Sequence, residues 1–244
     1  MAERPARAPR LYVEIELRPG AKLGLPAAAA HHVARVLRLR EGEAVTLFDG
    51  RGGEYDAKVC LPGRGHVVAE VGARHEIERE SPLAVTLVQA VSAGEKMDYT
   101  IQKAVELGVA AIQPVLTERS VVRLAGERAA KRLEHWQRVA IAACEQCGRN
   151  RVPEVREPLP LARYRPEAAA TKLLLSPLAG KSLREIPQAR LVLAVGPEAG
   201  FAAEEEAQLE RAGFVPVRLG PRVLRTETAA LAALAALNAL HGDF

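Results

Sequence analysis

The sequence has little cysteine and no long apolar run, and each absence excludes a class of protein. Three cysteines in 244 residues are too few for a disulfide framework. The longest apolar stretch lies near the C-terminus and falls short of the roughly 20 residues that span a bilayer. The basic start, MAERPARAPR, lacks the apolar segment of a secretory signal peptide. We therefore expect a cytoplasmic protein without a membrane partner.

The composition is that of a folded protein with a mildly basic surface. Hydrophobic residues make up 48% and charged residues 26% of the chain, and the net charge is +4. Only seven of the 34 basic residues are lysine, so arginine dominates. Arginine forms paired hydrogen bonds with phosphate and stacks on bases, which favours a nucleic-acid partner. A GC-rich or heat-adapted genome explains the same bias equally well.

The first part of the chain, residues 1–72, reads as a small β-rich domain. Alternating apolar and polar residues predict short strands, and one helix is expected at residues 27–39. Short strands with turns at this spacing are typical of a small barrel. The strands are expected at residues 11–17, 45–48, 54–61 and 66–71. The charged residues 73–82, which end in Ser-Pro, are expected to form a linker.

From residue 83 to residue 244 the pattern changes to strands alternating with helices. This alternation predicts an α/β domain whose parallel sheet is covered on both faces. Strands are expected at 85–91, 111–116, 172–175, 191–195 and 215–217, and helices at 97–107, 127–147, 203–211 and 226–240. The last helix is apolar all round, so it must be buried, in the core or against a second subunit.

Two glycine-containing loops are the strongest candidates for a binding site. Residues 196–201 (GPEAGF) and residues 219–228 (LGPRVLRTET) both follow strands, so both leave the carboxyl edge of the sheet, where such folds bind ligands. The first loop has neither the G-x-G-x-x-G pattern nor the lysine of a phosphate-binding loop. It carries Glu198, and a carboxylate repels phosphate. We therefore expect a cationic or neutral ligand with hydroxyls, such as S-adenosylmethionine (SAM).

Two basic segments have both a structural and a functional interpretation. His31 and His32 share an expected helix with Arg35 and Arg38, and Gln146, Arg149 and Asn150 lie where the long helix ends. The structural interpretation is that the first segment is a solvated helix face and that the second lies at a helix C-terminus, which favours cations. Contact with RNA explains them equally well. The single pair formed by Cys144 and Cys147 is weak evidence for a metal, and we expect none.

Several segments in this order resemble the RsmE family of SPOUT-class methyltransferases. They are HHVARVLRLREGE, KMDYTIQKAVELGVAAIQPVLTERS, EHWQRVAIAACEQCGRNRVPEV, VGPEAGF and LGPRVLRTETA, and together they cover nearly the whole chain. The last is the most specific. The chain departs from the family at Ala199, where a second glycine is usual, and we expect this small side chain to be tolerated.

The resemblance implies a fold and an activity. It implies a PUA-like β-barrel over residues 1–72 and a SPOUT domain over residues 83–244, with a parallel sheet and a C-terminal trefoil knot. It also implies a homodimer that uses SAM to methylate N3 of a uridine in 16S ribosomal RNA of the 30S subunit, position 1498 in the family's usual naming. Methylation of a ribose 2′-OH, or a non-catalytic role in RNA binding or ribosome assembly, remain alternatives.

The candidate site residues follow from the loops and from the resemblance. Arg225 is the candidate for stabilising the uracil anion, with Arg222 in reserve, and Glu198 is a candidate base or orienting group. Cofactor contacts are expected from Leu175, Ser176, Val195, Gly196, Pro197, Gly200, Leu219, Gly220, Val223, Leu224 and Thr226. RNA contacts are expected from His32, Arg35, Arg38, Lys96, Gln146, Arg149, Asn150 and Arg222.

Overall fold

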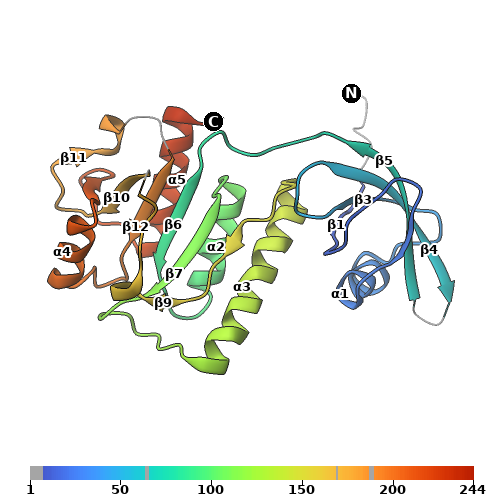
Figure 1. Ribbon diagram of the computed structural model, residues 1–244, viewed down its shortest axis with the longest axis horizontal. Helices are drawn as coiled ribbons and strands as arrows, with labels where there is room; N and C mark the ends of the chain where they lie inside the picture. Colours follow the sequence, from blue (N-terminus) through green and yellow to red (C-terminus); the bar gives the residue numbers. More distant parts are fainter. Residues whose placement is uncertain (1–7, 64–65, 169, 187–189) are drawn as a thin grey trace. The chain divides into compact units, whose positions relative to one another are not determined.

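The fold is that of a computed structural model, which describes residues 8–63, 66–168, 170–186 and 190–244 (Figure 1). Its contacts divide the chain into two units. Unit 1 consists of Met1–Glu80 and Cys144–Val152, and unit 2 of Ser81–Ala143 and Pro153–Phe244. The end of the longest helix and the loop behind it thus belong to unit 1, which no local sequence pattern indicated. The linker expected at residues 73–82 stays a prediction.

Unit 1 is built on a five-stranded sheet in the order β1-β3-β4-β5-β2. Strand β1 runs parallel to β3, and the other pairs are antiparallel. The inward side chains of this sheet form an apolar core that includes Val33 from the helical segment between β2 and β3. The strands are β1 (Arg10–Tyr12), β2 (Lys22–Gly24), β3 (Ala44–Phe48), β4 (Glu54–Gly63) and β5 (His66–His75).

Two expectations for unit 1 need refinement. The strand expected over residues 11–17 ends at Tyr12, and although Val13 and Leu17 stay buried, Ile15 between them is exposed. The expected helix is present as α1 (Ala27–His31), but it continues as a π-helix over His32–Leu37. Arg38 ends it with φ +52°, the only positive φ of a non-glycine residue in the described chain. Such π-helical turns are frequent at functional sites.

Unit 2 confirms the predicted α/β class. Its sheet has the order β11-β13-β10-β12-β6-β7-β8, with β9 beside β7, and every pair in it is parallel. Every residue of the central strands β6 and β12 is buried, as expected when helices cover both faces. The strands are β6 (Val85–Ala90), β7 (Ala111–Leu116), β8 (Glu154–Val155), β9 (Leu159–Pro160), β10 (Thr171–Leu175), β11 (Lys181–Ser182), β12 (Leu191–Val195) and β13 (Val215–Arg218).

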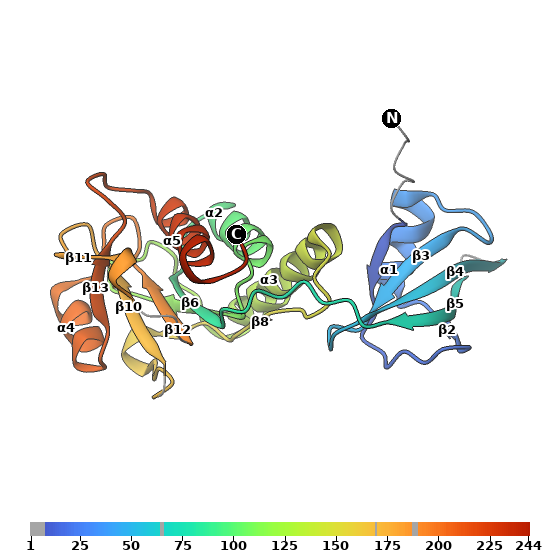
Figure 2. The same ribbon diagram turned by 90° about the horizontal axis from the view of Figure 1, so that it is seen from above.

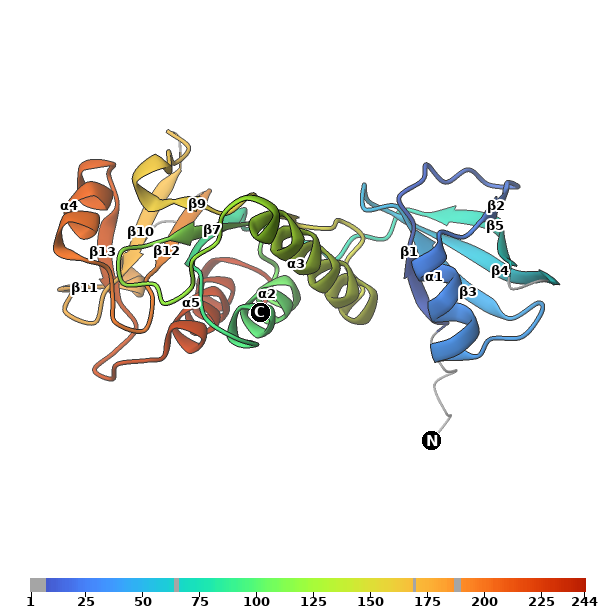
Figure 3. The same cartoon turned by 90° about the horizontal axis from the view of Figure 1, so that it is seen from below.

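Helices α2 (Lys96–Glu106) and α5 (Thr226–His241) lie side by side on one face of this sheet, and α4 (Ala203–Arg211) lies on the other (Figures 2 and 3). The long helix α3 spans Gly126–Cys147. On the α4 face, side chains of β6, β10 and β12 form one apolar cluster with Leu209. Two short 3₁₀ turns, at Leu161–Arg163 and Leu183–Glu185, come directly after β9 and β11.

The apolar helix α5 is fastened to the sheet and to α2. Ala230, Ala233, Leu234 and Leu237 are fully buried. Asn238 donates from Nδ2 to the carbonyl of Leu107 at 2.8 Å, which ties the far end of α5 to the end of α2. Within the described residues, none of the helices combines the length and the apolarity of a membrane span. The C-terminal knot that the resemblance implies stays a prediction.

Candidate functional site

A cavity of about 290 Å³ opens at the carboxyl edge of the sheet in unit 2. The ends of β10, β12 and β13 and the loops behind them form its walls, and the start of α5 completes it. All eleven residues expected to contact a cofactor lie in its lining, namely Leu175, Ser176, Val195, Gly196, Pro197, Gly200, Leu219, Gly220, Val223, Leu224 and Thr226. The two loops singled out in the sequence therefore do meet, although ligand contact stays a prediction.

The loop at residues 196–201 needs glycine at two positions, for different reasons. A Cβ atom on Gly196 would lie 3.1 Å from the ring of Phe201 and 3.2 Å from its backbone nitrogen, so a side chain there would crowd Phe201 and require it to shift by a few tenths of an ångström. Gly200 has φ +71°, a conformation that other residues rarely adopt. Ala199 has no positive φ. The departure from the family's second glycine therefore introduces no backbone strain.

Thr226, the first residue of α5, joins the two loops. Its hydroxyl donates to the carbonyl of Gly196 at 2.6 Å and accepts from Nε2 of Gln89 at 2.9 Å. Gln89 is a fully buried polar residue in strand β6, all of whose residues are buried. Gln89 was not among the predicted site residues, yet a glutamine inside a buried strand is a recognisable signal, because a buried polar group needs a partner.

Charged side chains from three segments gather at this cavity. Nζ of Lys96, the first residue of α2, lies 2.6 Å from Oε1 of Glu198 in the cavity wall. The hydrogen bond from Lys96 lowers the pKa of Glu198, and the same bond raises the pKa of Lys96. Arg225 and Glu227, which flank Thr226, also act on the pKa of Lys96, in opposite directions. The contact of Lys96 with RNA stays a prediction, and in this structure its ammonium bonds Glu198.

The two candidate arginines are placed differently. Arg222 lies in the cavity lining, whereas Arg225 caps the start of α5 just outside it, and both are exposed to solvent. A third arginine, Arg119, braces the first loop by donating from Nη1 to the carbonyls of Ala199 and Phe201, both at 3.1 Å. The first loop is therefore held from two sides, by Thr226 and by Arg119.

The chemistry of the lining suits SAM. Apolar walls from Leu175, Leu219 and Leu224 alternate with backbone of the glycine turns, which can approach a flat ring and ribose hydroxyls. Two carboxylates, Glu198 and Glu206, offer acceptors to a cationic ligand. The side chains present fit a bound SAM, with its sulfonium and amino group, better than a nucleotide phosphate.

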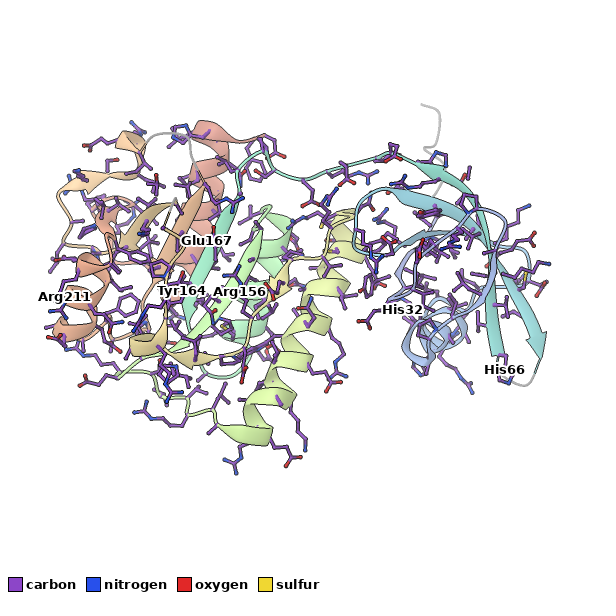
Figure 4. All side chains as sticks on the ribbon, viewed as in Figure 1. His32, His66, Arg156, Tyr164, Glu167 and Arg211 are labelled. Carbon is purple, nitrogen blue, oxygen red and sulfur yellow. The ribbon has the colours of Figure 1, made fainter. Side chains whose placement is uncertain are left out.

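The other predicted RNA contacts lie in unit 1, where some are exposed and some are buried. Arg35 and Arg38 are exposed on and just after the π-helix, and His32 opens that helix (Figure 4). Gln146, near the end of α3, is also exposed. By contrast Arg149 is only 5% exposed, because its guanidinium pairs with the carboxylate of Glu80.

Asn150 belongs to the same buried polar network in unit 1. Its side chain is fully buried, accepts from Arg10 at 2.5 Å and donates to Glu54 at 3.2 Å. Glu54 also accepts from Arg10 at 2.5 Å and from Arg79 at 3.0 Å. Burial alone would raise the pKa of Glu54, but these hydrogen bonds outweigh it and lower the pKa to about 2. The structure thus assigns Asn150 an internal role, and its contact with RNA stays a prediction.

Cys144, the first cysteine of the pair, is a buried thiol. Burial raises the pKa of the Cys144 thiol to about 12, so the thiol keeps its proton at neutral pH. Only a thiolate binds metal or attacks well. Among the described residues, no group of three or more His, Cys, Asp or Glu side chains is placed to hold a metal ion.

Comparison with known proteins agrees with this architecture. The family model of an RNA methyltransferase domain matches residues 79–238, and that of an RNA methyltransferase PUA domain matches residues 25–72. Fold and site together therefore define the class, an RNA methyltransferase with an N-terminal PUA domain. Ribosomal RNA small subunit methyltransferase E of Buchnera aphidicola is 34% identical over 97% of this chain and 98% of its own length. The chain belongs to this family, the RsmE family.

Two solved structures are similar over nearly the whole chain. One is ribosomal RNA small subunit methyltransferase E of Neisseria gonorrhoeae bound to S-adenosyl methionine, 44% identical with a TM-score of 0.90. The other is a putative methyltransferase of Legionella pneumophila in complex with SAM, 43% identical with a TM-score of 0.94. Each covers 98% of this chain and 100% of its own. The likeness supports the SPOUT fold class that the resemblance implied.

Proposed function

We propose that this protein transfers a methyl group from SAM to N3 of one uridine in 16S ribosomal RNA of the small ribosomal subunit. The observation that carries the proposal is the cavity at the carboxyl edge of the unit 2 sheet, where both glycine loops converge. Two relatives solved with SAM support it, and so do relatives named as small-subunit rRNA methyltransferases. An rRNA substrate would place the reaction in the cytoplasm.

The cavity residues would hold SAM through backbone and apolar contacts. Gly196 and Leu219 would present main-chain groups to the ligand, and Leu175 and Leu224 would pack against its ring. When bound, SAM supplies an electrophilic methyl group on a positively charged sulfur. The protein's main task is then to hold donor and target base close and aligned, since alignment supplies much of the rate of such a displacement.

Arg225 would stabilise the uracil as N3 loses its proton. Uridine N3 is a poor nucleophile until that proton leaves, and the negative charge then spreads to the flanking carbonyl oxygens. A fixed cation next to those oxygens lowers the barrier in the way an oxyanion hole does. Arg225 suits this role because it caps α5 one residue before Thr226, which is bonded to the cavity wall.

Glu198 serves better as an orienting group than as the base. The hydrogen bond from Lys96 lowers its pKa, and a carboxylate with a lowered pKa is a weak proton acceptor at neutral pH. We therefore propose that Glu198 holds donor groups of the ligand at the cavity wall. The N3 proton would leave to solvent.

The RNA would be held by the exposed basic residues of unit 1. Arg35 and Arg38 are exposed and form no ion pair with another described residue, so both are available to phosphate. His32 and Gln146 join this proposed surface, and Arg222 and Lys96 would act beside the cavity. We also propose that the protein is a homodimer, because α5 leaves a partly exposed face formed by Leu231, Ala232, Ala235 and Ala236.

The test uses the RNA in its natural particle. Protein, methyl-labelled SAM and small subunits that lack the modification are incubated, and the RNA is digested and analysed by mass spectrometry. Label on the base of a single uridine, at N3, is the expected result. Label on a ribose would overturn the proposed target atom, and the absence of any transfer would overturn the proposed activity.

A further inference from the structure

The start of α5 places a second carboxylate next to Lys96. Glu227 follows Thr226 in the first turn of α5. Helices α2 and α5 lie side by side, and Asn238 of α5 bonds the carbonyl of Leu107 at the end of α2. Glu227 and Lys96 each lie eleven positions before that contact, so they occupy the same end of the helix pair, and Glu227 raises the pKa of Lys96. Lys96 nevertheless hydrogen-bonds Glu198 and not Glu227. Lys96 thus lies between two carboxylates, one in the cavity wall and one on α5.

Glu227 carries an unmet hydrogen-bonding demand. Its Oε2 is buried, and no group among the described residues bonds to it. A buried acceptor without a donor is costly, so its presence calls for an explanation. Oε1 of Gln89, on the side chain bonded to Thr226, is likewise buried without a partner in the described chain.

The side chain of Lys96 is able to change partner. The bond from Thr226 to Gly196 joins the start of α5 to the loop that carries Glu198. The backbone segments of Glu198 and Glu227 are therefore connected. Lys96 has a flexible four-carbon stem, and its side chain is 39% exposed. An ammonium has three donors, so it can leave one carboxylate for the other without losing its charge pairing.

We propose that Glu227 is a positioning residue for Lys96: when a ligand cation or hydroxyl takes Glu198, Lys96 moves to Oε2 of Glu227. The exchange frees Glu198 for the ligand. It also moves the positive charge of Lys96 away from a cationic ligand, which it would otherwise repel. It also satisfies the buried oxygen of Glu227. This inference rests on the proposed function, because it assumes that the cavity receives SAM.

The experiment is a double-mutant cycle read out as SAM affinity by titration calorimetry. Glu227→Gln leaves Lys96 without its second carboxylate, so SAM should bind roughly three- to fivefold more weakly, the size of an exposed ion pair. Lys96→Met removes the competitor for Glu198, so SAM should bind at least as tightly as to the wild type. In the double variant, the effect of Glu227→Gln should vanish.

Controls separate this role from loss of fold and from direct binding of the ligand. Lys103 and Glu106, also on α2, form an ion pair of 2.7 Å, and the same substitutions there should leave SAM affinity unchanged. Lys96→Arg keeps the cation, so Glu227→Gln should again weaken binding in that background. The proposal would be overturned if Glu227→Gln weakened SAM binding equally in the wild-type and Lys96→Met backgrounds. It would also be overturned if Glu227→Gln weakened binding in neither background. A wild type that does not bind SAM would instead overturn the proposed function.

Discussion

Replacing Thr226 by valine tests whether one buried hydroxyl holds the cavity together. The side chain is 4% exposed, and its hydroxyl makes two hydrogen bonds, to Gly196 at 2.6 Å and from Gln89 at 2.9 Å. Valine has nearly the same shape but neither donor nor acceptor. Leaving a buried group unpaired costs about 1–3 kcal/mol, and Gln89 keeps its second bond, to Ala90. We therefore expect the free energy of unfolding to fall by about 2 kcal/mol.

The assay combines thermal unfolding with SAM titration. A fall of about 2 kcal/mol corresponds to a decrease in Tm of roughly 4–8 °C for a chain of this size. SAM affinity should fall as well, since the carbonyl released at Gly196 belongs to the cavity wall. Thr226→Ser is the matched control, because it keeps the hydroxyl and should retain SAM affinity. If the valine variant melts and binds like the wild type, the hydroxyl does not organise the site.

Other regions of the molecule give four further expectations. Arg225→Ala should retain SAM binding and lose most methylation in a single-turnover assay; normal turnover would remove Arg225 from the mechanism. RNA affinity should fall steeply with salt, and replacing Arg35 and Arg38 by glutamine should flatten the slope by about 0.7 for each phosphate that is no longer neutralised, as for single strands. Because the pKa of Glu54 lies at about 2 in the folded protein and ordinarily at 4.5, its stabilisation should be complete above pH 4.5 and lost as the pH falls toward 2; Glu54→Gln should remove this part of an acid-unfolding curve. Leu231→Glu should yield monomers in light scattering if α5 forms the dimer interface, whereas an unchanged mass would place the interface elsewhere.

Local sequence patterns predicted the architecture of unit 2 well because short apolar runs alternate along the chain with helical segments. The strand at residues 191–195 and the helix at residues 203–211 have the predicted limits. The cavity followed from them, since loops behind parallel strands must emerge at one edge of the sheet. In unit 1, the strand expected over residues 11–17 was too long. Val13 still donates to the carbonyl of Phe48 in β3, but Ile15, which the alternation placed on the buried side, is 45% exposed.

What the sequence could not show is which distant partners the polar residues choose. Asn150 and Arg149 stand beside exposed Gln146 at a helix end, a position that suits RNA contact. Their partners, Glu54 and Glu80, are 96 and 69 positions away along the chain, so no local pattern identifies them. The same holds for Lys96, whose bond to Glu198 spans 102 positions.

The Lys96–Glu198 pair changes the interpretation of the site more than the network in unit 1 does. From the sequence alone, Glu198 was a plausible base, because only its place in the loop was known. The hydrogen bond from Lys96 makes that carboxylate a weaker base, because it lowers the pKa of Glu198. In the proposed exchange, a cationic ligand must compete with Lys96 for Glu198. The buried oxygen of Glu227 then offers the displaced ammonium a second acceptor. The charge balance of the site therefore depends on the start of α5 as much as on the glycine loops.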